Sequence, residues 1–355
     1  MNFEEFLNRM HRFSNDPSKV DIGGSVPKQF VRINDDVADG CEHKNTTIAS
    51  TGKNVADSMF FKELYESLLS GNSSYKTYIN SFFIDEDGKP RSSSDIYVPK
   101  FVNVLVKDVD WKKWLYAEVI GSRLANMMNV PVVFNTAPCG ANEIIYSATS
   151  SKYRLMSVDF IPFGYEVENL DDMGFSSCGC TSQIQNYIDT IVREMPAIAK
   201  KYNLNVTQER MDRLFKDMCL QFLFRSCMCG DSDGDVNNYA IFYNRENGDF
   251  MLSPVFDMEG LFTQKLSANS EFKYQSFQSL KYINKHYPEL LMDFMGRAIR
   301  LRTSEELKKC MLETLILSET YKTGDFYEFV KSNIDTMTQQ CSRLKMPKSK
   351  VNEME

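Results

Sequence analysis

Histidine is scarce in this chain. Only three of the 355 residues are histidines, and His11, His43 and His286 are far apart in the sequence. Zinc centres and Ser-His-Asp triads both rely on imidazole groups, and zinc ligands recur at short, characteristic spacings. The scarcity of histidine therefore argues against a histidine-based metal centre and against a histidine-dependent triad.

The chain also has no surplus of basic residues and no long apolar run. It carries 41 Lys and Arg against 48 Asp and Glu, which gives a formal net charge of −7. Proteins that bind nucleic acid usually present a basic surface, so we expect no direct contact with nucleic acid. No apolar stretch approaches the roughly 20 residues of a membrane-spanning helix, and residues 1–6 lack the basic and apolar regions of a secretory signal. These features predict a cytoplasmic protein without a membrane span and leave export by a specialised secretion system open.

Cysteine occurs nine times, an odd number that follows no framework spacing. In a chain of this length, such a distribution is typical of reduced thiols in a cytosol. Cys178 and Cys180 could be combined with Cys227 and Cys229 as a zinc site. Structural zinc sites prefer two to four residues between paired cysteines, so we interpret all four as loop and helix thiols.

The apolar pattern divides the chain into a strand-rich part and a helix-rich part. With 43% hydrophobic and 25% charged residues the composition is globular, and 355 residues allow one large domain or two lobes. We predict an N-terminal helix and loop-rich segment (1–55), a strand-rich unit (56–160), a helical unit (161–346) and a disordered tail (347–355). Periodicity predicts helices at 2–13, 57–69, 110–129, 182–202, 207–228 and within 278–345, and strands at 29–33, 75–84, 95–106, 130–135, 143–148, 153–160, 239–243 and 249–253. Strands 75–84 and 95–106 are expected to form an antiparallel hairpin, because turn-forming residues separate them.

The most informative segment is a loop of acidic and small residues that begins at Gly230. Four residues separate Asp233 from Asn238, which is the spacing of the base Asp and the metal-binding Asn in kinase catalytic loops. The hairpin 239–253 then returns the chain toward the same place, and Asp257 follows it. Phosphoryl transfer needs this set, because one carboxylate orients the attacking hydroxyl while an amide oxygen and a second carboxylate hold magnesium on the nucleotide phosphates.

A calcium-binding loop is the alternative interpretation of the same segment. Asp231, Asp233 and Asp235 alternate as they do at the start of an EF-hand. However, the sixth position is Val236 instead of glycine, and the twelfth is Phe242 instead of the bidentate glutamate. The kinase interpretation is therefore favoured, and the distant Asp257 adds to it.

Two motifs carry a family resemblance, Gly230-x-x-Asp233-Gly234-x-x-x-Asn238 and Leu252-x-Pro254-x-Phe256-Asp257. They resemble the catalytic and metal-binding motifs of the HipA-like kinases, whose fold is related to that of phosphatidylinositol 3-kinases. The resemblance is greatest to compact members without an extended amino-terminal domain. It extends over about 65–300 and is strongest at 214–260. It implies an α+β, two-lobed kinase-like fold, in which an antiparallel-sheet N-lobe with one main helix precedes a mostly helical C-lobe.

The resemblance also implies roles for individual residues. Asp233 would be the catalytic base, and Asn238 and Asp257 would be the magnesium ligands. Lys100, at the end of Ile96-Tyr97-Val98-Pro99-Lys100-Phe101, would contact the α and β phosphates of ATP. Glu118 on the following helix would pair with Lys100, as the corresponding Lys and Glu do in kinases generally.

Two further segments are similar to nucleotide-binding parts of the family. Ser70, Gly71, Asn72 and Ser73 lie in a loop of small residues whose N–H groups can cradle phosphate, although Gly23-Gly24-Ser25 is a rival for this role. The segment 157–160 joins the two halves of the chain. By the resemblance it would be the hinge, in which the backbone of Asp159 and Phe160 binds adenine.

One position departs from the family pattern. The chain has Asp235 where the family usually has histidine. An extra carboxylate beside the base would disturb its ionisation through like-charge repulsion, or it would recruit a second cation. This departure keeps open a pseudokinase that binds nucleotide or a partner without turnover.

Taken as a whole, the resemblance implies a bacterial ATP- and Mg²⁺-dependent kinase that phosphorylates Ser or Thr hydroxyls of a protein substrate. Members of the family act as toxins of toxin–antitoxin pairs, with a small antitoxin protein as partner, or as secreted effectors. A small-molecule or lipid kinase is the remaining alternative, because the fold is related to kinases of that kind.

Overall fold

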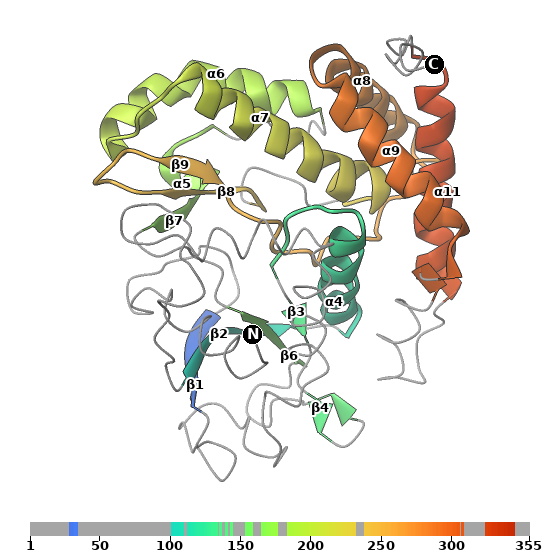
Figure 1. Cartoon of the computed structure of the whole chain (residues 1–355). Coiled ribbons are helices and arrows are strands. Elements are labelled where there is room, and N and C mark those ends of the chain that lie inside the picture. The colour runs from blue at the N-terminus through green and yellow to red at the C-terminus, as the bar shows by residue number, and fades with distance from the viewer. Residues whose placement is uncertain are drawn as a thin grey trace, which may run out of the picture.

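A computed structural model describes the backbone of twelve stretches of the chain, which are 28–34, 101–109, 112–133, 135–136, 139–140, 143–144, 153–158, 165–176, 183–231, 238–305, 307–308 and 324–344. They form a mixed α and β fold in which the C-terminal part is rich in helices (Figure 1). Within these stretches, no helix combines the length and the apolar character needed to cross a membrane. The predicted helices at 2–13 and 57–69 and the predicted tail lie outside the described residues.

An antiparallel four-stranded sheet is built from β1 (Lys28–Asn34), β2 (Phe101–Val109), β6 (Tyr153–Val158) and β3 (Asn135–Thr136), in that order. β2 and β6 are rich in β-branched residues, as expected for strands. Over residues 104–107, β2 pairs with β1 on one edge and with β6 on the other. β1 was not the partner predicted for this strand, and the predicted hairpin with 75–84 stays a prediction, because 75–84 and 95–100 lie outside the described residues.

Helix α4 (Lys112–Met127) confirms the helix predicted at 110–129. One side of it packs against the four-stranded sheet through Leu115, Val119 and Leu155. Its other buried apolar residues, among them Tyr116 and Ile120, belong to the main core shared with the C-terminal part. Because α4 is buried on both sides, a polar residue within it needs a specific partner.

A second antiparallel sheet consists of β7 (Glu166–Asn169), β8 (Ala240–Tyr243) and β9 (Phe250–Leu252), with β8 in the centre. The β8–β9 hairpin was predicted, whereas β7 was not. Asn244 closes the turn, since its Oδ1 accepts hydrogen bonds from the N–H groups of Glu246 and Asn247. The remaining short elements are the strands β4 (Cys139–Gly140) and β5 (Glu143–Ile144), which pair with each other, and helix α5 (Leu170–Met173).

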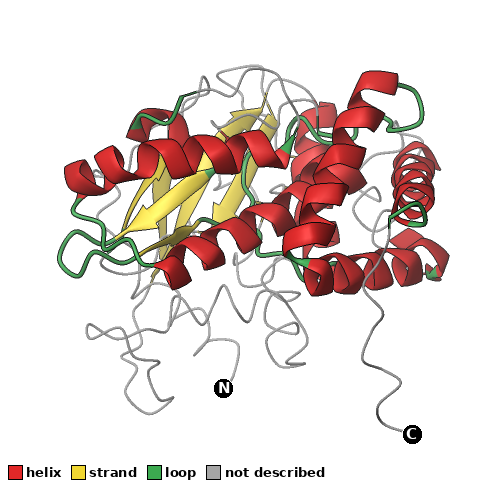
Figure 2. Ribbon diagram, turned by 90° about the horizontal axis from the view of Figure 1, so that it is seen from above, coloured by secondary structure: helices red, strands yellow, loops and turns green. Residues whose placement is uncertain are grey.

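Two long helices, α6 (Ile184–Tyr202) and α7 (Gln208–Phe222), lie along the second sheet (Figure 2). Both were predicted from their amphipathic spacing. Thr207 caps α7, because its side chain accepts a hydrogen bond from Arg210 N at 3.3 Å. After Phe222 the helix continues as one π-helical segment, η5 (Leu223–Met228), which leads directly to Gly230.

The C-terminal helices α8 (Ser270–His286), α9 (Pro288–Thr303) and α11 (Gly324–Cys341) pack together against η5 and α7. Asn269 caps α8, and Pro288 occupies the first turn of α9, where its missing N–H has no cost. The helical region begins at Ser270, earlier than the predicted 278. Buried Asn333 accepts a hydrogen bond from Leu266 N and donates one to Met228 O, so α11 is joined to the end of η5.

Candidate functional site

Three of the predicted site residues, Glu118, Asn238 and Asp257, lie in the described part of the chain. The others lie outside it and remain predictions: Lys100, Asp233, Ser70, Gly71, Asn72, Ser73, Asp159 and Phe160, together with Asp235. The geometry of the site is therefore described from Glu118 on α4, from η5, which precedes the loop, from Asn238, which ends it, and from the segment around Asp257.

Asp257 has an unusual backbone conformation. Its φ is +51°, in the left-handed region, which costs a residue other than glycine of order 1–3 kcal/mol unless its surroundings impose it. The segment before it is fixed to the strand-like residues after α4, because Val255 N donates to Pro131 O and Val133 N donates to Val255 O, each at 2.9 Å. The chain thus arrives at Asp257 along a defined path and turns sharply there.

A group of three carboxylates forms around this turn. Oxygen atoms of Glu118, Asp257 and Glu259 all lie within 4.8 Å of one another. Glu118 is only 1% exposed. Like charges this close in a partly buried place repel strongly, so the group favours a nearby cation. Carboxylate oxygens are hard donors of the kind that Mg²⁺ and Mn²⁺ prefer, so the residues present fit a divalent ion of this class.

Glu118 is held in place by the segment that follows α4. Asn135 Nδ2 donates a hydrogen bond of 2.8 Å to Glu118 Oε2. Ser122, one turn further along α4, donates to Val133 O at 2.9 Å and accepts from Asn135 N at 3.3 Å. Asn135 and Ser122 were not identified from the sequence. The predicted pairing of Glu118 with Lys100 stays a prediction, since Lys100 lies outside the described residues.

Gly121 lets α4 approach the segment after Asp257. A Cβ at this position would lie 2.6 Å from Leu261 Cδ1 and 2.8 Å from Met258 Sδ. These distances are shorter than a carbon side chain tolerates, although both neighbours are flexible side-chain atoms. The small residue therefore brings the helix that carries Glu118 against the chain that carries Asp257 and Glu259.

Arg225, in η5, is the residue that connects the two predicted metal ligands. Its side chain is fully buried, and Nε forms a 2.7 Å ion pair with Asp231 Oδ2, which is also fully buried. Nη1 donates to Asn238 O at 3.1 Å and to Phe256 O at 2.8 Å, and Nη2 donates to Asp257 O at 3.0 Å. We call these five residues the Arg225 cluster. Burial lowers the pKa of the guanidinium, but the combined attraction of Asp231, Tyr239 and Asp257 outweighs it, so the pKa is raised and Arg225 stays charged.

Gly230 fixes the start of the loop. Its φ is +61°, and a Cβ there would lie 2.1 Å from the carbonyl oxygen of Gln264. Gly230 O in turn accepts hydrogen bonds from Gln264 N at 2.9 Å and Thr263 N at 3.2 Å. The glycine of the sequence motif is therefore needed both for its backbone conformation and for this close contact.

The buried cysteines behave as packing residues. Cys227 and Cys229 are fully buried, and Cys227 Sγ lies 3.3 Å from Ser276 Oγ. Burial raises the pKa of Cys227 to about 12, so its thiol stays protonated at neutral pH. Among the described residues, the candidate metal-binding group contains no cysteine. Cys178 and Cys180 lie outside the described residues.

Comparisons with known proteins give structural matches but no sequence match. No family model and no curated protein matches this chain. Among solved structures, it is similar to the proinflammatory kinase CtkA of Helicobacter pylori, with 13% identity over 68% of this chain and 91% of CtkA, and a TM-score of 0.45. It is also similar to HipA of Shewanella oneidensis, solved with HipB and operator DNA, with 14% identity and a TM-score of 0.35. That match covers 68% of this chain and 58% of HipA, less than two thirds of its length.

Both structural neighbours are of the kind that the sequence motifs resemble. The identities and TM-scores are low, so the chemistry of the site has to be argued from the residues of this chain.

Proposed function

We propose that this chain is an ATP- and Mg²⁺-dependent kinase that transfers the γ-phosphoryl group of ATP to Ser or Thr hydroxyls of a protein. The observation that carries the proposal is the Arg225 cluster. One guanidinium binds the carbonyl groups of both Asn238 and Asp257, the two residues that the sequence motifs predict to be metal ligands. A solvated turn has no need of such an arrangement, whereas phosphoryl transfer needs these side chains in a fixed relation.

The proposed roles follow from the residues. Asp233 accepts the proton of the attacking hydroxyl, and Asn238 and Asp257 hold the metal. A bound magnesium ion would neutralise charge on the phosphates. Lys100, which directly precedes β2, binds the α and β phosphates, and β2 contacts the helix that carries Glu118. Glu118, held by Asn135, orients Lys100 when nucleotide is bound.

The remaining parts of the site follow the same proposal. Ser70, Gly71, Asn72 and Ser73 form the phosphate loop, and Asp159 and Phe160 bind adenine through their backbone. The chain would then divide into a nucleotide-binding N-lobe (56–160) and a helical C-lobe (161–346). Residues 1–55 precede these two lobes, and a tail (347–355) follows them. A bacterial cytoplasmic location, a protein substrate and a small antitoxin partner complete the proposal, on the sequence resemblance alone.

The direct test is to incubate the purified chain with ATP labelled at the γ-phosphate, with and without Mg²⁺, alone and with a bacterial lysate. Labelled phosphoserine or phosphothreonine that requires Mg²⁺ supports the proposal. Label found only in lipid or small molecules indicates the alternative substrate class. Nucleotide binding without any transfer indicates a pseudokinase, the alternative that Asp235 favours.

Two variants assign the roles. Asp233→Asn is expected to keep nucleotide binding and to lose transfer, because this carboxylate acts on the hydroxyl. Asp257→Ala is expected to weaken Mg²⁺-dependent ATP binding in calorimetry, because a metal ligand is lost. Asp293→Asn, an exposed acid paired with Arg297 on α9, is the matched control and should leave both unchanged. Normal transfer by Asp233→Asn, or unchanged ATP affinity of Asp257→Ala, would remove that residue from the site.

A further inference from the structure

We infer that Arg225 is a positioning residue of the phosphotransfer site, which sets the distance and orientation between Asn238 and Asp257 without touching substrate. This inference rests on the proposed function and deepens it. It concerns how two metal ligands separated by 19 positions in the sequence come to act as one site.

The first argument is the number and nature of the contacts. The guanidinium forms four interactions of 2.7–3.1 Å, with the carboxylate of Asp231 and with the carbonyl groups of Asn238, Phe256 and Asp257. A guanidinium is planar and presents its N–H groups in fixed directions. The three carbonyl groups are therefore held in a geometry that the shape of one side chain dictates, and a lysine could not reproduce it.

The second argument is the choice of partners. A buried arginine that served packing alone could satisfy its N–H groups with any carbonyl groups nearby. Arg225 instead binds the backbone carbonyl groups of both predicted ligands and the side-chain carboxylate of Asp231, which follows the Gly230 turn. A shift of either ligand backbone would move its side chain by a similar distance, and misplacement by about 1 Å can cost about 100-fold in rate.

The third argument is the conformation of the segment that carries Arg225. η5 is a π-helix, with a hydrogen bond from Cys229 N to Phe224 O. Such segments are rare and occur frequently at functional sites. The widened turn is fixed at its end, since Asn333 on α11 donates to Met228 O. Arg225 thus projects from a rigid support, which a positioning role requires.

The test compares two variants with the wild-type chain. Arg225→Lys keeps the positive charge but loses the planar guanidinium, whose N–H groups point in fixed directions. Arg225→Met combined with Asp231→Leu removes both charges, so that neither is left buried alone. Arg297→Met combined with Asp293→Leu, an exposed pair on α9, is the matched control. Folding is checked by circular dichroism, and Mn²⁺ binding in the presence of ADP is measured from the electron paramagnetic resonance signal of the free ion.

We expect Mn²⁺ to bind at least about tenfold more weakly to both Arg225 variants, as when groups that support metal ligands are removed. We also expect kcat to fall by about 100-fold or more, with a smaller change in KM for the protein substrate. The control should match the wild type. Folded Arg225 variants whose Mn²⁺ affinity lies within about twofold of the wild type would overturn the inference.

The wild-type chain supplies a measurement that does not depend on the variants being folded. In a ¹⁵N-arginine spectrum, the Nε–H of Arg225 should exchange slowly with solvent and shift when Mg²⁺ and ADP are added. An unchanged resonance at saturating Mg²⁺ and ADP would contradict the inference. The two proposals can fail separately. If the wild-type chain transfers no phosphate, the proposed kinase activity is refuted. If its Arg225 variants nevertheless bind Mn²⁺ more weakly than the wild type, the positioning role is kept.

Discussion

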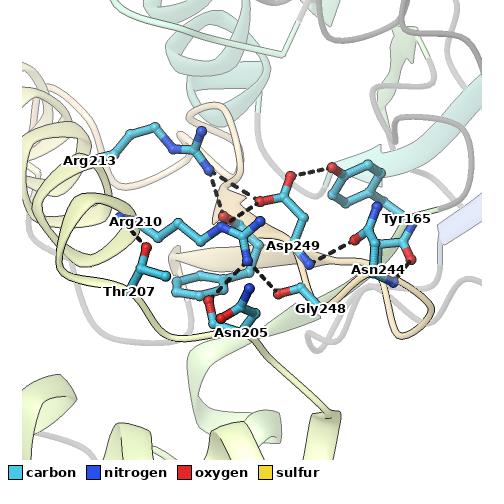
Figure 3. A network of polar contacts seen from close by, with 10 residues as sticks. Tyr165, Asn205, Thr207, Arg210, Arg213, Asn244, Gly248 and Asp249 are labelled. Carbon is cyan, nitrogen blue, oxygen red and sulfur yellow. Dashed lines mark hydrogen bonds and ion pairs between the residues drawn. The ribbon is translucent and has the colours of Figure 1, made fainter. Parts of the chain in front are cut away.

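The two ends of the continuous helix α7–η5 use the same kind of contact in opposite surroundings. At the η5 end lies the Arg225 cluster. At the α7 end, Arg210 and Arg213 approach Asp249, which also accepts a hydrogen bond from Tyr165; we call these four residues the Asp249 cluster (Figure 3). In both clusters arginine side chains pair with an aspartate and donate to backbone carbonyl groups of the β8–β9 region. The clusters differ in exposure to water.

In the Asp249 cluster the groups are accessible. Arg210 Nε lies 3.2 Å and Arg213 Nη2 3.5 Å from Asp249 Oδ1, and the three side chains are 25%, 49% and 21% exposed. Arg210 also donates to Gly248 O, and Arg213 donates to Phe250 O. Water can replace these hydrogen bonds when one is lost. In the Arg225 cluster the two ion-paired side chains, Arg225 and Asp231, are both 0% exposed.

Between the two clusters, Gln221 Nε2 donates to Ser253 O at 2.6 Å. Side chains of α7–η5 therefore satisfy carbonyl groups along β9 and its extension as far as Asp257, at the edge of the sheet that has no further strand in the described residues. The same kind of contact, an arginine side chain of α7–η5 that donates to backbone carbonyl groups, therefore serves two purposes. At the exposed end it fastens a turn, and at the buried end it fixes the residues proposed to hold the metal.

The largest expected effect is on stability at the buried end. Arg225→Met leaves Asp231 as a buried charge without its ion pair and should lower the free energy of unfolding by about 3–5 kcal/mol. Arg213→Met, at the exposed end, should lower it by less than about 1 kcal/mol. Urea unfolding of both variants measures the difference. Similar losses from the two variants would show that burial does not separate the two clusters.

The substitution Gly230→Ala should have the next largest effect on stability. Gly230→Ala introduces a Cβ 2.1 Å from Gln264 O and strains a left-handed backbone, so we expect a loss of about 2–5 kcal/mol. Gly174 is the matched control, because its φ is also positive, at +102°, but no atom lies within 4 Å of the added Cβ. Gly174→Ala should cost about 1–2 kcal/mol, from the backbone alone. Thermal unfolding of the pair would contradict this account if the two losses were equal.

Much of the C-terminal fold could be predicted because its elements are long and amphipathic. The helices α6 and α7 and the β8–β9 hairpin follow from local periodicity and turn residues. β7 was missed because its four residues are too few for a pattern. The pairing of β1 with β2 was missed because it joins segments about 70 residues apart, and no local signal specifies such a pairing.

Residues of the candidate site could be predicted only where their spacing in the sequence matches that of a known chemical motif. Asn238 and Asp257 were identified from their motifs, and Glu118 from its place on the helix after the Lys100 strand. Arg225, Asn135 and Glu259 were missed, because their importance depends on tertiary contacts. One signal was available for Arg225, a single charge within the apolar run 222–228, which indicates a buried ion pair.

Asp217 lies on α7 between the two clusters, and the pKa of its carboxyl group shows the effect of burial there. Burial raises the pKa of its carboxyl group from 3.8 to about 6, despite the attraction of Arg213 and Lys216. The folded state therefore binds the proton more tightly than the unfolded state. The stability that protonation provides is fully present below pH 3.8 and is lost as the pH rises through about 6.

Asp217→Asn should consequently stabilise the chain at pH 7. Since one pKa unit corresponds to about 1.4 kcal/mol, the gain is at most about 3 kcal/mol, and we expect about 1–2 kcal/mol because the side chain is partly exposed. The gain should vanish at about pH 3, well below 3.8, where the wild-type carboxyl group is mostly protonated in both states. Urea unfolding at the two pH values measures it, and an equal gain at both would assign the effect to something other than this carboxyl group.

The smallest expected effect is that of charge in the Asp249 cluster. Asp249→Asn removes the ion pairs with Arg210 and Arg213 but keeps an oxygen that can accept the hydrogen bond from Tyr165. Exposed ion pairs contribute about 0.2–1 kcal/mol each and are screened by salt. The variant should therefore lose about 1 kcal/mol at low ionic strength and less in 0.5 M NaCl, in the same urea assay. The matched change at the buried end, Asp231→Asn, should cost more and respond little to salt, because both side chains of the Arg225–Asp231 ion pair are 0% exposed. A loss above about 3 kcal/mol from Asp249→Asn that salt does not alter would mean that both ends of the helix act as buried supports, and the distinction between fastening and positioning would fail.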